Sequence, residues 1–146
     1  MVYSFLNVVA TIAGPGGILN LAAGAAVSEE GITIEAVEDK NVMTIGADGK
    51  GQHSLVANDA ALVTVRLLKT SPVNAGLMLM YDLQSASSSL WGQNVFTIAD
   101  TARLDATVLQ SAAFKKKPTI TYAKEGGMME WTFDAISATS ILGANQ

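Results

Sequence analysis

Short segments in which apolar and polar residues alternate recur along this chain, and turns rich in Gly, Asn and Asp separate them. The clearest segment is 128–138, where Met129, Trp131 and Phe133 alternate with polar residues. A period of two residues is typical of a β-strand that rests one face on a core. The chain is therefore expected to be mainly β, a sandwich or barrel-like protomer of short, mostly antiparallel strands.

The remaining strands are expected between turn signals such as Gly14-Pro15-Gly16-Gly17. Residues 119–123 and 128–138 are expected to form a hairpin around Lys124-Glu125-Gly126-Gly127, and residues 32–37 are expected to pair with 41–46. The other expected strands are 3–12, 18–21, 53–57, 61–69, 94–99 and 104–114.

One helix is expected, flanking the strands at about residues 72–86. Ser71 suits the N-cap and Pro72 suits the first helical position. Leu77, Met80 and Tyr81 follow at helical spacing, and Asp82 is the one charged residue in this stretch. A helix this apolar is expected to be covered on two sides.

The chain has no internal repeat and no linker, so residues 1–146 are expected to form a single domain. Within it, residues 30–58 are the candidate for an extended hairpin, and residues 140–146 are expected to be a loose tail.

The composition adds a surplus of apolar surface. Hydrophobic residues make up 49% of the chain and charged residues 15%, against about 25% charged in an average domain. No stretch approaches the roughly 18 apolar residues of a membrane-spanning helix, so no such segment is expected. The surplus is best accommodated by contact with other protein chains.

Chemistry-bearing residues are sparse. Cysteine is absent and His53 is the one histidine, so neither a thiolate nor a His-cluster metal site is expected. No Ser-His-Asp arrangement is visible. The sequence therefore predicts a protein that is not an enzyme and that uses no cofactor or metal.

The charge is acidic, with a net charge of −4 and one basic run, Lys115-Lys116-Lys117. A tight nucleic-acid binder normally carries a larger basic patch. This balance argues against sequence-specific DNA binding, but it is compatible with a surface that DNA passes without adhering.

Taken together and in order, several stretches resemble the tail tube proteins of contractile-tailed bacteriophages. The resemblance runs from about residue 3 to residue 136. It is carried by SEEGITIE (28–35), EDKN (38–41), MTIGADG (43–49), TVRLLKTSPVNA (64–75), WGQN (91–94), AFKK (113–116) and YAKEGGMMEW (122–131).

This resemblance implies a structural protein of the virion, made in the cytoplasm of a bacterial host. Six protomers would form a ring and rings would stack into a hollow tube, with strands of neighbouring subunits joined in a continuous inner barrel. The implied partners are the tail sheath protein, the tape-measure protein and the baseplate. After sheath contraction, DNA would pass through the tube into the host.

Within that arrangement, the hairpin at 30–58 would reach an adjacent ring. Its candidate inter-subunit contacts are Ile32, Ile34, Met43, Ile45 and Leu55. A negative lumen wall would repel phosphates and limit DNA adhesion. The candidate acids for that wall are Glu30, Glu35, Glu38, Asp39, Glu130 and Asp134.

Two other functions fit the residues. The first is a small-molecule or carbohydrate-binding β-sandwich, in which Trp91 and Trp131 would line the site. The second is another homo-oligomeric structural protein of the virion, such as a capsid decoration or a sheath component.

Overall fold

The computed structural model describes residue 4 and residues 7–21 and 27–143, and the side chains of residues 27–30 lie outside that description. The described part holds nine strands and one helix, so the expected mainly β class with a single helix is confirmed. The elements are β1 Val8–Gly14, β2 Gly17–Asn20, β3 Val27–Ala36, β4 Asn41–Ile45, β5 Gly51–Leu55, β6 Ala61–Leu68, α1 Val73–Ser85, β7 Asn94–Asp100, β8 Asp105–Lys116 and β9 Met128–Ile141.

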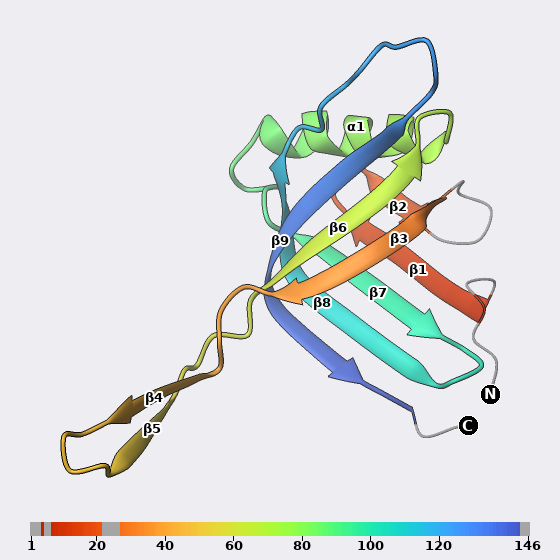
Figure 1. Ribbon diagram of the computed structural model, residues 1–146. Coiled ribbons are helices and arrows are strands. Elements are labelled where there is room, and N and C mark those ends of the chain that lie inside the picture. The colour runs from red at the N-terminus through yellow and green to blue at the C-terminus, as the bar shows by residue number, and fades with distance from the viewer. Residues whose placement is uncertain (1–3, 5–6, 22–26, 144–146) are drawn as a thin grey trace.

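Seven strands form one antiparallel sheet in the order β2-β1-β7-β8-β9-β6-β3, and β4 and β5 form a separate pair. The sheet folds over on itself, with β3 and β6 in front of β1, β7 and β8 (Figure 1). β9 joins the two layers, because its residues 128–135 pair with β6 while its residues 132–141 pair with β8.

The core lies between these layers and consists of the inward residues that the alternating pattern predicts. Trp131 and Phe133 of β9 are fully buried, together with Phe96 of β7. The Phe133 ring centroid lies 4.7 Å from those of both Phe96 and Phe114, which is within the range of favourable aromatic pairs. The Trp131 Nε1 donates a hydrogen bond to Asn74 Oδ1 at 3.0 Å, so the buried indole has a partner.

The helix closes one end of this core. The structure places Pro72 at the N-cap, one residue later than expected, and Ser71 Oγ accepts a hydrogen bond from the Val73 N–H at 3.3 Å. Leu77, Met80 and Gln84 are buried on one side of α1, whereas Leu79 is 71% exposed. Within this chain only one side of the helix is covered, and cover of the other side by a second chain stays a prediction.

A buried amide pair ties α1 to β7. Gln84 Nε2 donates to Asn94 Oδ1 at 2.8 Å, and Asn94 Nδ2 returns a bond to Gln84 Oε1 at 2.9 Å. Gln84 Nε2 also donates to the Pro15 carbonyl at 2.9 Å. Because both amides are fully buried, these bonds satisfy groups that would otherwise be costly to desolvate.

The expected hairpin of 119–123 with 128–138 is wrong. β8 itself pairs with β9, with Phe114 opposite Phe133 and Lys116 opposite Thr132, and the residues between these strands form a loop. Pro118 cannot donate a bond to a strand ladder. The loop instead bonds to Lys69, whose Nζ donates to the Thr121 carbonyl and whose N–H donates to the Gly127 carbonyl.

The expected pairing of 32–37 with 41–46 is also wrong. β3 pairs with β6, while β4 pairs with β5 in an arm that projects from the sheet (Figure 1). The projecting part is therefore 37–60 instead of 30–58. Lys40 and Asp59 close its neck with an ion pair at 2.8 Å.

Both expected chain ends need adjustment. β1 starts at Val8, and residue 3, where a strand was expected to begin, lies outside the described residues. At the other end, Ser140 and Ile141 still belong to β9 and pair with Thr107 and Ala106, so they are not part of a loose tail.

Candidate assembly surfaces

The β4–β5 arm presents an apolar face to solvent. Asn41 pairs with Leu55, Met43 with His53 and Ile45 with Gly51, and paired residues lie on the same side of a two-stranded ribbon. Met43, Ile45 and Leu55 therefore share one face, where they are 59%, 59% and 82% exposed. On this face Asn41 Nδ2 lies 3.0 Å from His53 Nδ1.

The two other candidate contact residues lie in the body of the molecule. Ile32 and Ile34 are on the inward face of β3, opposite Val65 and Val63 of β6. Ile32 packs against the core, and Ile34 is 37% exposed. The five residues predicted as one contact set are therefore divided between the arm and the edge of the sheet.

Three of the six candidate acids share the outer face of the sheet. Glu35 lies opposite Leu62, Leu62 lies opposite Asp134, and Asp134 in turn lies opposite Ala113. Glu130 lies four residues before Asp134, and this even spacing places both on the same side of β9. Glu35, Glu130 and Asp134 are all exposed.

Basic residues accompany these acids. Arg66 Nε lies 3.3 Å from Glu130 Oε2, and Arg66 Nη1 donates to Thr33 Oγ1 at 3.1 Å. Lys115 lines a shallow depression together with Glu35 and Asp134. The face is therefore mixed in charge.

The other candidate acids lie elsewhere. Glu38 and Asp39 are exposed in the neck of the arm, between β3 and β4. The Glu30 side chain lies outside the described residues. The structure therefore does not bring the six acids together on one wall.

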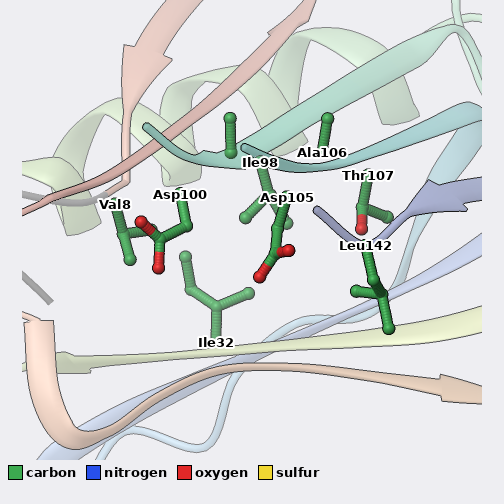
Figure 2. Close-up of a pocket in the computed structure, with 9 residues that line it drawn as sticks. Val8, Ile32, Ile98, Asp100, Asp105, Ala106, Thr107 and Leu142 are labelled. Atoms are coloured by element: carbon green, nitrogen blue, oxygen red, sulfur yellow. The ribbon is translucent and has the colours of Figure 1, made fainter. Parts of the chain in front are cut away.

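A cavity of about 240 Å³ opens between the two layers of the sheet. Figure 2 shows its lining, in which Val8, Ile32 and Leu142 surround the carboxylates of Asp100 and Asp105. Asp100 Oδ1 accepts bonds from the N–H groups of Ala102 and Arg103 at 3.1 and 3.3 Å. The Gly143 N–H donates to Asp105 Oδ1 at 2.6 Å. These bonds give both carboxylates a structural role in holding adjacent turns.

The tryptophans do not form a shared ligand platform. Trp131 is fully buried, and Trp91 is 37% exposed, with its ring 6.0 Å from that of Tyr81 in an edge-on arrangement. The expected carbohydrate site lined by both residues therefore has no geometric support.

The described part of the chain has neither a metal-binding cluster nor a helix that could span a membrane. It contains no group of three or more His, Asp or Glu side chains suited to a metal ion. None of its helices is long and apolar enough to cross a membrane.

Sequence reasoning missed the basic loop 117–127. Lys69 Nζ lies 4.0 Å from the centroid of the Tyr122 ring. Tyr122 is nevertheless 87% exposed. The proximity of Pro118 to three lysines was a usable signal, because a proline there argues against a regular strand.

Comparison with known proteins agrees with this architecture. Residues 1–143 match the model of the family described as bacteriophage PhiTE tail tube protein. No curated protein sequence matches the chain.

Three solved structures share the fold at low sequence identity. The anti-feeding prophage cap, a tube terminating cap, has 12% identity and a TM-score of 0.58, over 98% of this chain and 92% of that one. The sheath/tube terminator of PVC, an extracellular contractile injection system, has 12% identity and a TM-score of 0.59, over 97% of both chains. The sheath–tube complex of PVC has 10% identity and a TM-score of 0.52, over 91% of this chain and 88% of that one.

The fold is thus that of tube-forming and tube-capping proteins of contractile machines. Because the family match spans nearly the whole chain, the protein belongs to the phage tail tube family represented by bacteriophage PhiTE, and it is a structural component of the virion tail. The resemblance inferred from the sequence is confirmed.

Proposed function

We propose that six copies of this chain form a ring, and that rings stack into a hollow tube that conducts DNA into the host after sheath contraction. The observation that carries the proposal is the β4–β5 arm, whose Met43, Ile45 and Leu55 lie exposed on one face. A lone two-stranded hairpin is marginally stable in water, and clustered exposed apolar residues indicate a contact surface. The arm is suited to binding an adjacent ring.

Ring closure uses the free edges of the sheet. Among the described strands, β2 and β3 end the seven-stranded sheet. Unpaired edges readily accept another strand. Pairing of β2 in one protomer with β3 in the next would continue the sheet around the ring and leave no edge within it.

The outer face of β3, β6 and β9 is the proposed lumen wall. Glu35 and Asp134 lie on this face, on either side of Leu62. Repeated around a ring, they would keep phosphates from adhering. The positive charges of Arg66 and Lys115 offset part of the negative charge of these acids, so the wall repels DNA weakly.

The proposed partners are the sheath, the tape-measure protein and the baseplate. Family membership supports a position inside a tail, where a tube contacts all three. Synthesis in the host cytoplasm and assembly into the virion belong to the same proposal.

Electron microscopy of the purified protein tests this function. We expect rings and tubes about 100 Å wide, from six domains of this size. The variant Met43→Ser/Ile45→Ser should abolish tubes and leave the protomer folded, because both side chains are exposed.

The matched control is Val42→Ser, which removes an apolar group from the opposite face of the same strand, where Val42 is 50% exposed. It should leave most tube formation intact. A monodisperse monomer of the unmodified protein at high concentration would contradict the proposed function.

A further inference from the structure

The two ends of β6 carry segments of opposite charge. The arm, residues 37–60, leads into β6 at its first residue, Ala61. The loop 117–127 leads into β9 at Met128, which lies opposite Leu68, the last residue of β6. The eight residues of β6 separate the two segments by about 23 Å. They lie at opposite ends of the molecule (Figure 1).

The arm is acidic. Residues 37–60 hold four acids and two lysines. Lys40 is already paired with Asp59 at 2.8 Å, and Asp48 Oδ1 accepts a bond from the Lys50 N–H. Glu38 and Asp39 are exposed at the neck and form no ion pair with any described residue.

The loop end is basic. Residues 115–127 hold four lysines and one glutamate. Lys116, Lys117 and Lys124 are exposed, and within the described part of the chain none of them forms an ion pair.

Lys69 holds this loop in place. Its Nζ donates to the Thr121 carbonyl and lies 4.0 Å from the centroid of the Tyr122 ring. Its N–H donates to the Gly127 carbonyl at 3.0 Å. Tyr122 and Ile120 remain 87% and 44% exposed. A positioned, exposed aromatic residue among charges is typical of an interface anchor.

We infer that the loop 117–127 is the receptor for the arm of a second copy of this chain, stacked head to tail. Lys117 and Lys124 face Glu38 and Asp39 of that copy, while Tyr122 packs against its exposed arm face. The inference rests on the proposed ring stacking and names the surface that receives the arm.

Charge complementarity favours a second copy over nucleic acid. The chain supplies both signs, at opposite ends, so each copy can donate an arm and accept one. Contacts between different ends of identical subunits propagate in one direction and build an open-ended stack. The whole chain carries a net charge of −4, and this negative charge weakens the long-range attraction of the protein to the phosphates of a nucleic acid.

Charge reversal with rescue tests the inference. Lys117→Glu/Lys124→Glu and Glu38→Lys/Asp39→Lys should each raise the protein concentration needed for tube growth by about tenfold, since like charges would meet at every subunit contact of a ring. The chain carrying all four substitutions should return to within about threefold of the original, because complementarity is restored. The control Asp82→Lys alters an exposed residue of α1 and should change little.

The readouts are ring and tube counts by electron microscopy, sedimentation at 0.05 and 0.5 M salt, and filter retention of duplex DNA. Higher salt should weaken stacking of the original protein.

If single-end reversals stop tubes and the four-substitution chain does not recover, the loop is not the receptor, although ring stacking still stands. If loop reversal leaves tubes normal and abolishes DNA retention, the loop binds nucleic acid and the inference is overturned. If the unmodified protein forms neither rings nor tubes, the proposed function itself fails.

Discussion

At the residue scale, the contact between Gly14 and Asn94 shows how tightly the α1–β7 junction is packed. A Cβ on Gly14 would lie 2.0 Å from Asn94 Oδ1, the atom that accepts the bond from Gln84 Nε2. Any side chain at residue 14 would therefore displace the buried amide pair. This constraint acts on atoms 80 residues apart in the chain and leaves no local trace in the sequence.

We expect Gly14→Ala to lower the free energy of unfolding by about 1–3 kcal/mol, through overpacking and a strained or lost hydrogen bond. Gly126→Ala is the matched control, because no atom lies within 4 Å of a Cβ built there. Urea unfolding followed by the fluorescence of buried Trp131 measures both. Equal stability of the two variants would show that the amide pair is not held as described.

At the element scale, α1 separates a buried side from an exposed one. Leu77 is fully buried, and Leu79, two residues later, is 71% exposed. The low charge of the helix suggested cover on both sides, but within a single chain only one side packs on the core. The exposed side is available to neighbouring proteins.

Leu77→Ala should cost about 2–5 kcal/mol of stability, because it leaves a cavity beneath the helix. Leu79→Ala should cost less than about 0.5 kcal/mol, since it removes no buried contact. Thermal and urea unfolding of the pair checks this. A large loss for Leu79→Ala in dilute protein would mean that the exposed side is covered within the protomer.

At the scale of the whole molecule, the proposed tube depends on which face of the folded sheet lines the lumen. Glu35 and Asp134 are the informative acids, since they are exposed on one face and have no ion pair among the described residues. Glu130 is less suitable for substitution, because it is bonded to Arg66.

Phage carrying Glu35→Lys/Asp134→Lys should assemble normally and deliver DNA more slowly, as phosphates adhere to a basic wall. The control is Asp82→Lys on α1, away from this face. Genome delivery per minute after adsorption is the measurement. Unchanged delivery would place these acids outside the channel.

The sequence by itself determined the mainly β class, the single helix and the tail tube family. These properties follow from local periodicity, from capping residues near Ser71 and from ordered motifs, all of which can be read without knowing distant neighbours.

Only the tertiary structure decided which strands are neighbours. Alternation tells which face of a strand is apolar but not which strand lies beside it. It therefore predicts β4 beside β3 and the segment 119–123 beside β9, whereas β3 lies beside β6 and β9 lies between β6 and β8. The same pairings decide that Glu35 and Asp134 share a face while Glu38 and Asp39 lie in the arm. Strand pairing joins residues far apart in the chain, and its free energy comes from the packed layers as a whole.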